Sequence, residues 1–408
     1  MENTGSILLK HWDIIHLYIP LLVIGIWRWS LWIFKKIVTS FYEPIPTSGY
    51  KASVSVIVPV YNEDPDTFQL ALNSWQKNKP EEIIAVINHS DTACIDVFNQ
   101  FRAENQTARL IVTTQRGKRP ALAEGIYAAK GEIIALADSD AIWDLNIIST
   151  LLAPFIDPKV GGVGPRQDVW ETDTFARRLF NIRLKHRFDN EMSYLSVVSH
   201  ALTSLSGRTA LYRGKILKEI VPEMLNETFW GKPCISGEDK CLTRLIQERG
   251  WKVQYQGNAR IQTVGAANLG TYLKQNIRWG RNSWRSDLKT LFSTWVWKRE
   301  KLFALHLVDR FIQPFTLFIG PVYIVLSLIL GHWLVALTLL FWFHISRAIK
   351  IYPHLRQTPS EILILPMYVA IQYTLGVLKL YAFVTMNQQG WVTRLKKEPM
   401  VTNKPVTS

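Results

Sequence analysis

Cysteine is scarce in this sequence, with three residues among 408. Cys94 stands alone, and Cys234 and Cys241 do not have the spacing of paired metal ligands. A disulfide-stabilised scaffold needs a dense set of cysteines, and a zinc module needs closely spaced Cys or His ligands. The sequence therefore argues against both classes.

Acidic charge is also in short supply, because 33 Asp and Glu stand against 47 Lys and Arg, for a net charge of +14. A basic balance suits nucleic acid, an anionic lipid surface or a phosphate-bearing substrate. The chain has no run of Lys and Arg interleaved with aromatic residues, so we expect no nucleic-acid partner. We assign the charge to membrane lipid and an anionic substrate. The sequence does not indicate an oligomeric state.

Long apolar runs are missing from the middle of the chain and are concentrated toward its two ends. Residues 14–34 are long enough to cross a bilayer, carry one interior charge, Arg28, and are followed by Lys35 and Lys36. By the positive-inside rule, the segment that follows is cytoplasmic. The stretch has no small-residue cleavage site, so we predict a retained anchor and not a removed signal peptide.

After residue 301 the chain becomes apolar again. Residues 314–331 and 333–349 predict a hairpin of membrane helices, and 302–313 predict an interfacial helix. A further apolar stretch covers 361–386. A full crossing there would place the basic tail outside, against the positive-inside rule. Either this stretch lies in the interface or turns back, or the number of membrane crossings differs from the one these segments suggest.

Between these apolar regions, strands and helices alternate. The pattern predicts strands at 53–60, 82–88, 109–113 and 132–137, and helices at 66–78, 93–105 and 120–129. Such alternation is typical of an α/β fold with a mostly parallel, Rossmann-like sheet, whose ligands lie beyond the carboxyl ends of the strands. The polar residues that follow the strands are therefore the candidates for a site.

The first candidate motif is Asp138-Ser139-Asp140, directly after the predicted strand 132–137. In an extended chain residues i and i+2 point the same way, so both carboxylates can face one ion. Hard oxygen ligands suit Mg²⁺ or Mn²⁺ bridging a diphosphate. A solvated turn is the alternative interpretation, because Asp and Ser populate turns freely.

The second motif is Gly237-Glu238-Asp239, at the start of a helix predicted from about 238 to 249. One interpretation is structural: Ser236 caps the helix, and acidic residues favour its N-terminus. The other is catalytic: Asp239 is a general base that takes the proton from an acceptor hydroxyl as it attacks an anomeric carbon. Such a base contributes a factor of about 10² to 10⁴ in rate.

The third motif is Gln275, Arg278 and Trp279, which are spaced i, i+3 and i+4 and so share one face of a helix. The guanidinium can hold a diphosphate, the amide can bind it or a sugar, and the indole offers a flat surface for the acceptor ring. An amphipathic surface helix beside the membrane is the alternative.

Together the three motifs resemble those of the family 2 processive glycosyltransferases, namely hyaluronan, Nod-factor chitooligosaccharide, chitin and cellulose synthases. Further segments favour the hyaluronan and chitooligosaccharide branch: residues 58–63 (VPVYNE), 117–119 (GKR), 205–207 (LSG), 211–213 (LYR) and 391–394 (WVTR). In the last segment Val392 stands where the hyaluronan synthases have Gly. The similarity spans about residues 53–394, nearly the whole chain.

The resemblance implies a GT-A fold that inverts the anomeric centre of a UDP-sugar in one displacement, with Mg²⁺ or Mn²⁺ as cofactor. It assigns Asp239 as the base and Asp140 to the metal. The nucleotide-sugar site would comprise Tyr61, Glu63, Asn88, Lys118, Arg119 and Asp138. The acceptor and diphosphate site would comprise Ser206, Gly207, Glu238, Gln275, Arg278 and Trp279. A loop that closes over bound nucleotide would contain Trp391, Thr393 and Arg394.

One position departs from the family. After the second strand the family usually places an acidic residue near the uracil, whereas this chain has Asn88. An amide can still accept a hydrogen bond from uracil N3–H and donate one to O4, so UDP use remains the expectation.

The resemblance divides the chain into a membrane anchor, a GT-A domain, transmembrane and interfacial helices, and a cytoplasmic gating motif with a basic tail, at residues 1–44, 45–300, 301–390 and 391–408. We expect a multi-pass protein of the cell membrane with a cytoplasmic catalytic domain. It would polymerise UDP-sugar donors, UDP-GlcNAc and UDP-GlcA by resemblance, onto a growing glycan acceptor and export the product. UDP-GlcNAc alone, or UDP-Glc with UDP-GlcA, are alternatives.

Several polar residues fall at or near bilayer depth and are compatible with a glycan path or with snorkelling side chains: Arg28, Arg310, Gln313, His344, Arg347, Gln372 and Lys379. Two other functions compete. Transfer of one sugar to a polyprenyl phosphate would not need the helix that carries Gln275, Arg278 and Trp279. A non-catalytic nucleotide-binding membrane scaffold would not need the carboxylates.

Overall fold

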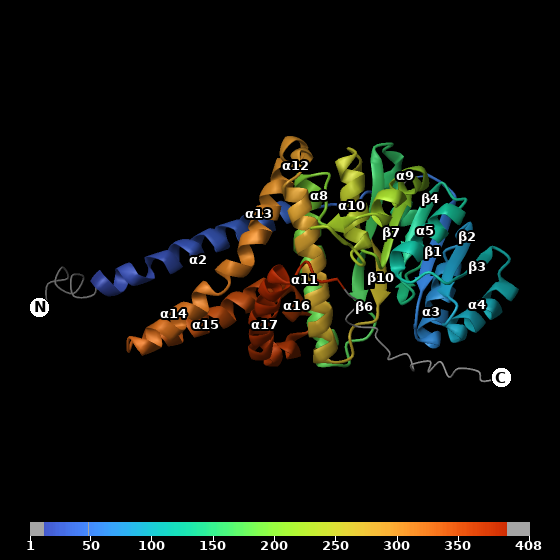
Figure 1. Ribbon diagram of the computed structural model, residues 1–408. Coiled ribbons are helices and arrows are strands. Elements are labelled where there is room, and N and C mark those ends of the chain that lie inside the picture. The colour runs from blue at the N-terminus through green and yellow to red at the C-terminus, as the bar shows by residue number, and fades with distance from the viewer. Residues whose placement is uncertain (1–11, 48, 390–408) are drawn as a thin grey trace, which may run out of the picture.

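The computed structural model describes residues 12–47 and 49–389 as an α/β domain with a long arm of helices on one side (Figure 1). The domain contains an eight-stranded sheet of order β3-β2-β1-β4-β7-β6-β10-β5. The strands are β1 Val54–Val60, β2 Glu82–Asn88, β3 Ala108–Thr113, β4 Ile133–Ala137, β5 Ala141–Trp143, β6 Val160–Val169, β7 Thr209–Arg213 and β10 Lys252–Thr263. A small hairpin pairs β8 Thr228–Phe229 with β9 Lys232–Pro233.

The domain helices cover both faces of this sheet. They are α3 Pro65–Gln76, α4 Thr92–Glu104, α5 Lys118–Ala128, α6 Ile147–Leu152, α7 Phe175–His186, α8 Ser193–Val198, α9 Gly214–Leu225, α10 Glu238–Glu248 and α11 Leu269–Leu291, with a 3-10 turn at Ala153–Ile156 and a π-helical turn at Arg187–Met192. Every strand and helix predicted between residues 53 and 137 is present, with ends shifted by at most two residues. The mostly parallel sheet is confirmed.

The central strands form because their sequences are almost wholly apolar. β1, β2 and β4 are buried along nearly their full length, as expected for parallel strands covered on both faces. Ile57 and Val86 face one core layer, with helices α5, α7 and α9. Val58 and Ile87 face the other, with α3 and α4. Packing on both faces of the sheet therefore holds the carboxyl ends of these strands in place.

Strand β7 decides where the site forms. It runs antiparallel between β4 and β6, and its first residue, Thr209, pairs with Ala137 at the end of β4. The backbone N–H of Asp138 donates to the carbonyl of Arg208 at 3.0 Å. The loop that precedes β7 is thus held directly beside the residues that follow β4.

The remaining helices contain the apolar segments. They are α2 Trp12–Thr39, α12 Thr294–Arg299, α13 Lys301–Thr316, α14 Ile319–Ile329, α15 Trp333–Lys350, α16 Tyr352–Gln357, a 3-10 segment at Pro359–Ile364 and α17 Leu365–Val384. Four stretches among the described residues are long and apolar enough to cross a membrane: His16–Thr39, Lys301–Ile329, Trp333–Lys350 and Pro359–Val384.

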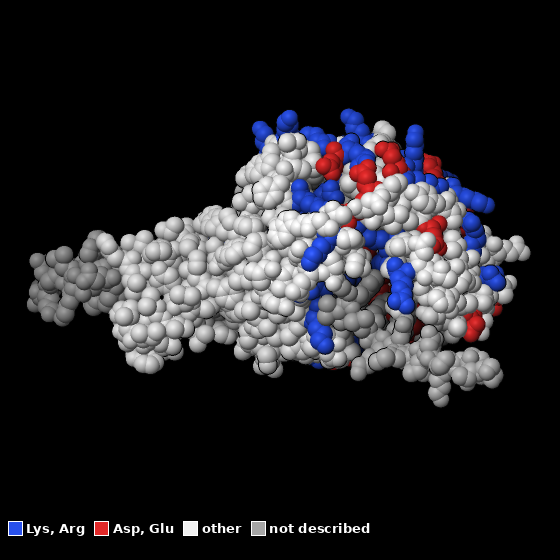
Figure 2. Space-filling model, viewed as in Figure 1, with Lys and Arg blue, Asp and Glu red and all other residues white. Residues whose placement is uncertain are grey.

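Helices α2, α14 and α15 extend together from the domain (Figure 1), and on the face in view this arm shows no charged side chain (Figure 2). Lys and Arg instead gather over the domain (Figure 2). The predicted hairpin is present, with its turn around Gly331. An arm whose visible face is uncharged, beside a basic domain, has the charge distribution of a membrane-inserted segment next to a water-facing one.

The helix boundaries before the hairpin differ from the prediction of an interfacial helix at 302–313. Helix α13 continues to Thr316, and α14 begins only at Ile319. The apolar stretch is divided because Pro314 has no N–H to donate within the helix, and α13 ends two residues later.

Helix α17 packs along α11 of the domain. A Cβ on Gly280 of α11 would lie 2.9 Å from the Cβ of Ala382, so glycine permits the close approach. The indole N–H of Trp284 donates to the carbonyl of Lys379 at 2.8 Å. The last apolar stretch is therefore attached to the helix that carries the third sequence motif.

Candidate active site

Lys118 joins two of the three motifs. It begins α5, and its Nζ lies 2.6 Å from Asp138 Oδ1 and 2.7 Å from Glu238 Oε1. Asp138 follows β4, whereas Glu238 is the first residue of α10. A single ammonium group therefore holds the Asp-Ser-Asp turn against the start of α10.

The loop before β7 borders the same centre. A Cβ added to Gly207 would lie 3.2 Å from Lys118 Nζ, 3.5 Å from Asp239 Cβ and 3.6 Å from Glu238 Oε1. Ser206, the preceding residue, accepts a hydrogen bond from the backbone N–H of Arg208 at 3.3 Å. Glycine at 207 lets the loop backbone approach the charged groups closely.

Arg278 brings the third motif to this centre. Burial lowers the pKa of its guanidinium, while the carboxylates of Glu238, Asp138 and Asp239 oppose that effect. The side chain on α11 thus lies in the field of carboxylates from both other motifs. The carboxylates of the first two motifs are thus close enough to Arg278 of the third to act on its charge.

The charges of Lys118 and Glu238 stabilise each other. Burial acts to lower the pKa of Lys118, but Asp138 and Glu238 more than offset it and hold the pKa above its ordinary value. Burial acts to raise the pKa of Glu238, but Lys118 reverses this, so the carboxyl keeps a pKa below its usual range. Both groups are therefore charged at neutral pH.

Asp239 follows Glu238 on the first turn of α10. Its backbone carbonyl accepts from the Thr243 hydroxyl at 2.7 Å, as usual within a helix. Within the described part of the chain, no ion pair involves the Asp239 carboxylate. Lys118 thus pairs with the neighbouring Glu238, and Asp239 borders Gly207 and acts on the charge of Arg278.

The start of α10 depends on a backbone conformation that favours glycine. Gly237 has φ +85°, and a Cβ there would lie 3.1 to 3.3 Å from atoms of the Asn282 side chain. The predicted cap by Ser236 is wrong: Gly237 is the N-cap residue, without a side-chain cap. The Ser236 hydroxyl instead donates to Asn282 Oδ1 at 2.9 Å, because α11 passes close enough to compete with the local cap.

Asn282 and Arg285 were not singled out from the sequence, although both lie near the face of Arg278, at i+4 and i+7 on α11. Asn282 Oδ1 accepts from Arg285 as well as from Ser236, and Arg285 also donates to the carbonyl of Met386 at 2.7 Å. These residues therefore connect the start of α10 with the end of α17. The i, i+4, i+7 spacing was the signal that could have found them.

Trp279 lies in a stack of rings and cations. Its ring packs on Phe180 with centroids 5.6 Å apart and an interplanar angle of 26°. The guanidinium groups of Arg183 and Arg208 lie 5.5 and 5.6 Å from the Trp279 ring centroid. Gln275 is half-buried one turn earlier on α11. Phe180 and the two guanidinium groups therefore hold the Trp279 ring in place.

Two residues predicted for the nucleotide site follow β1. The Ser139 hydroxyl donates to a carboxylate oxygen of Glu63, so this loop touches the Asp-Ser-Asp turn. Tyr61 is 45% exposed at the same edge of the sheet. Both residues therefore lie at the edge of the sheet that also carries the Asp138 turn.

Two other residues predicted to contact the nucleotide have partners within the protein. Asn88 Oδ1 accepts from the N–H and the hydroxyl of Ser90, and its amide donates to the carbonyl of Gln115 at 3.4 Å. Arg119 is 3% exposed and pairs with Glu227 at 2.7 Å. Arg119 therefore stabilises the segment that leads to α10, through Glu227 and the carbonyl of Ser236. The sequence pattern alone did not indicate this structural role.

Glu227 is the centre of that second, structural cluster. Its carboxylate pairs with Arg119, Arg244 and Lys289 at 2.7 to 3.0 Å. Burial acts to raise the pKa of Glu227, but Arg119 and Lys289 lower it to about 2. The cluster fixes the β8–β9 hairpin and the approach to α10, because an ion network with several partners restrains each of its members.

A divalent cation fits the carboxylates of the Asp-Ser-Asp turn. The described residues contain no group of three or more His, Cys, Asp or Glu side chains that could hold a metal ion. Mg²⁺ is commonly bound by one or two carboxylates together with substrate phosphates and water, without a cage made only of protein. Asp138 and Asp140 supply such a partial set of hard oxygen ligands.

The predicted closing loop, with Trp391, Thr393 and Arg394, lies outside the described residues. At the end of the described chain, Gln389 Oε1 accepts from the backbone N–H of Ile235 at 3.3 Å. Ile235 is four residues before Asp239. The end of the described chain is thus tied to the loop that leads into α10.

The fold and the site define a glycosyltransferase of the GT-A class. The sheet has an antiparallel strand beside β4 and an Asp-x-Asp turn at its carboxyl edge, and the acidic start of α10 is held against that turn. A mannosyltransferase, PcManGT from Pyrobaculum calidifontis, solved in complex with GDP-Man and Mn²⁺, superposes with a TM-score of 0.57 at 19% identity, over 94% of this chain and 97% of that one. At this identity the match concerns the fold alone.

Residues 52–282 match the model of the glycosyltransferase-like family 2, and the chain belongs to that family. It is 28% identical to a type 2 glycosyltransferase of Pyricularia oryzae, over 93% of this chain and 80% of the relative. An N-acetylglucosaminyltransferase of Rhizobium meliloti is 27% identical, over 86% and 83% of the two chains. The hyaluronan synthase of Streptococcus pyogenes is 26% identical, over 87% and 86%.

Proposed function

We propose that this protein is a membrane-embedded inverting glycosyltransferase that polymerises UDP-sugars. The observation that carries the proposal is the meeting of Asp239, Arg278 and the Lys118–Asp138 pair around one centre. A base, a cation for the leaving group and carboxylates for a metal are the parts that transfer from a nucleotide sugar requires.

In the proposed reaction, an acceptor hydroxyl oxygen attacks the anomeric carbon of the donor from the face opposite the diphosphate. The new C–O bond forms as the bond to the diphosphate oxygen breaks, and the hydroxyl proton passes to the carboxylate of Asp239. Glu238 is paired with Lys118. This division of roles leaves Asp239 as the acceptor of the proton.

The leaving diphosphate gains negative charge, and Arg278 is the side chain placed to stabilise it. Its guanidinium faces the carboxylates of the site and keeps its charge despite burial, because they oppose the effect of desolvation. Asp138 and Asp140 would hold Mg²⁺ or Mn²⁺, which supplies neutralisation of the phosphate charge when bound. Tyr61 and Glu63 would contact the uridine.

The acceptor would enter between the Ser206–Gly207 loop and Trp279. Gly207 lies against Asp239, and Trp279 presents its ring on α11 beside Arg208. Helix α11 is also packed on α17, so the acceptor side of the site adjoins a candidate membrane helix. This arrangement supports repeated addition to a glycan that leaves through the membrane.

UDP-GlcNAc with UDP-GlcA is the proposed donor pair. The support is the similarity to a hyaluronan synthase and to an N-acetylglucosaminyltransferase over more than four-fifths of each relative. We place the catalytic domain on the cytoplasmic side, where nucleotide sugars are made. Supplying labelled donors singly and in pairs to the purified protein tests the choice: polymer that forms from one donor alone would refute the pair.

Asp239→Asn tests the proposed base. Loss of a general base should lower turnover by at least about two orders of magnitude, while UDP affinity stays within about twofold. Asp96→Asn, an exposed change on α4 away from the site, is the matched control and should behave as wild type. Near-normal polymer output from Asp239→Asn would exclude Asp239 as the base.

A further inference from the structure

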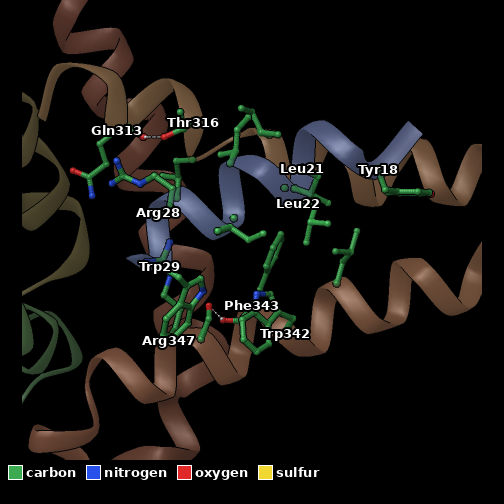
Figure 3. A pocket seen from close by; sticks show the side chains of 18 of the residues that line it. Tyr18, Leu21, Leu22, Arg28, Trp29, Gln313, Thr316, Trp342, Phe343 and Arg347 are labelled. Carbon is green, nitrogen blue, oxygen red and sulfur yellow. Dashed lines mark hydrogen bonds between the residues drawn. The ribbon is translucent and has the colours of Figure 1, made fainter. Parts of the chain in front are cut away.

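A groove of about 780 Å³ lies among the candidate membrane helices, away from the site described above. Its walls come from α2, from the α13–α14 segment and from α15, with Tyr373 of α17 at one side. Figure 3 shows Tyr18 toward one end of the groove and Arg28 with Gln313 toward the other. The groove thus follows the length of the helices.

The walls are apolar over most of their length. Leu21 and Leu22 of α2 face it, with Ile319 of α14 and Leu339 and Phe343 of α15. A polysaccharide carries hydroxyl groups on every ring, which such walls would leave without hydrogen-bond partners. A hydrocarbon chain, in contrast, needs no such partners and gains by close contact. The groove therefore suits a lipid chain better than a glycan.

Cationic side chains collect at one end of the groove. Arg28 is paired with Asp309, which also pairs with Lys35 at 2.6 Å. Lys350 places its Nζ over the Trp29 ring, 5.1 Å from the centroid. Arg347 lines the groove one turn before Lys350 and lies near Trp29 in Figure 3. These side chains lie at the end of α15 that faces the domain.

Arg347 and Lys350 differ from Arg28 in their charge balance. Among the residues that the structure describes, no carboxylate forms an ion pair with either of them. A half-buried cation at the edge of an apolar groove is costly unless an anion or water compensates it. Two such basic side chains, one helical turn apart, can both donate hydrogen bonds to the oxygens of one singly charged phosphate group.

We propose that this groove binds an anionic phospholipid of the surrounding bilayer, with one acyl chain along α2, α14 and α15 and the phosphate between Arg347 and Lys350. The lipid would add to the direct contacts between α2 and the α14–α15 hairpin, such as the hydrogen bond between the Tyr18 and Ser327 hydroxyls at 2.6 Å. The proposal concerns binding and does not depend on the sugar that the enzyme transfers.

The test uses the full-length protein in neutral detergent micelles, titrated with phosphatidylglycerol or with zwitterionic phosphatidylcholine. Native mass spectrometry counts bound lipid, and the thermal unfolding midpoint reports stabilisation. We expect one phosphatidylglycerol to be retained in preference to phosphatidylcholine. The double variant Arg347→Gln with Lys350→Gln should weaken that binding at least about tenfold. Arg356→Gln, an exposed change on α16 outside the groove, should leave it unchanged.

A second variant keeps both cations and blocks the chain. Gly25 lines the groove, and a Cβ there would meet nothing within 4 Å, so the Cβ of Gly25→Leu has room and the rest of its side chain would occupy groove space. We expect it to fold, because leucine favours a helix more than glycine does, and to lose phosphatidylglycerol binding as the double variant does. Should the double variant fail to fold, Gly25→Leu still decides the question.

Equal retention of the two lipids, or wild-type binding by both variants, would overturn the proposal. A third arm offers undecaprenyl phosphate together with a labelled UDP-sugar. If that lipid displaces phosphatidylglycerol and becomes glycosylated, the groove holds an acceptor and our assignment of a bilayer phospholipid is wrong. If it displaces phosphatidylglycerol poorly and takes no label, the assignment stands.

Discussion

Replacing Gly237 with alanine should show whether the position of the first turn of α10 affects turnover independently of the stability of the domain. Gly237 precedes Glu238 and Asp239 and has φ +85°. An alanine there meets two obstacles, a backbone conformation that L-residues rarely adopt and a Cβ at 3.1 to 3.3 Å from Asn282. Asn282 cannot easily move aside, since Ser236 and Arg285 both donate to its oxygen.

The two costs can be estimated separately. The left-handed conformation costs a non-glycine residue about 1–2 kcal/mol. Crowding of a packed site costs about 1–3 kcal/mol more. Because the side chain of Asn282 is held, the strain should be relieved by a shift of the first turn of α10. A misplacement of 1 Å can lower the rate about 10²-fold, so a shift of a few tenths of an ångström should lower turnover by about tenfold.

Gly231→Ala is the matched control. Gly231 has a similar φ of +75°, but a Cβ there would meet nothing within 4 Å. It should therefore lose about 1–2 kcal/mol of stability from the backbone alone and keep wild-type turnover. The difference in unfolding free energy between the two variants then measures the crowding against Asn282.

The assay combines thermal unfolding in micelles, UDP binding by calorimetry and incorporation of labelled sugar. We expect Gly237→Ala to keep UDP affinity and to lose turnover, with the larger loss of stability. Wild-type turnover in Gly237→Ala, or an equal loss of turnover in Gly231→Ala, would refute the argument that contact with Asn282 positions the start of α10.

Three further predictions concern charge and export. Folding lowers the pKa of Glu227 from 4.5 to about 2, so the stabilisation by its carboxylate is complete above about pH 4.5 and is lost as the pH falls toward 2. Glu227→Gln should therefore be less stable at neutral pH, and its unfolding free energy should depend less on pH in the acid range. An unchanged pH dependence in that range would contradict this. Activity should vanish on chelation and return with Mg²⁺ or Mn²⁺, whereas chelator-insensitive synthesis would argue against a metal at Asp140. In sealed vesicles supplied with UDP-sugars on the catalytic side, product should resist added glycosidase, and fully accessible product would argue against export.

The sequence predicted the local structure of the domain well because local signals decide it. The apolar runs that become β1, β2 and β4 have no other stable environment than a sheet covered on both faces, and the intervening helices have their own periodicity. The three motifs could be found because each is short. The carboxyl-edge rule for parallel strands singled out the first motif, and the resemblance to known enzymes predicted that the other two lie beside it.

The direction of individual side chains could not be read in this way. Lys118 and Arg119 are adjacent and both basic, yet Lys118 joins Asp138 and Glu238 while Arg119 turns to Glu227. Neighbouring helical residues face different partners, and the partners here are about twenty to over one hundred residues away. A sequence pattern reports the side chain that is present but not what the fold places opposite it.

The sequence by itself determined the class of the protein: an α/β domain flanked by apolar helices, with carboxylates at a strand end and at a helix start. These features depend on periodicity and on residue chemistry, which are local. Only the tertiary structure decided that the Ser236 hydroxyl donates a hydrogen bond to Asn282 instead of capping α10. It also decided that α17 lies along α11 and that Arg347 and Lys350 border an apolar groove. Each of these depends on the packing of segments distant in the chain, where the gain from burial and from charge pairing across elements exceeds the local preference.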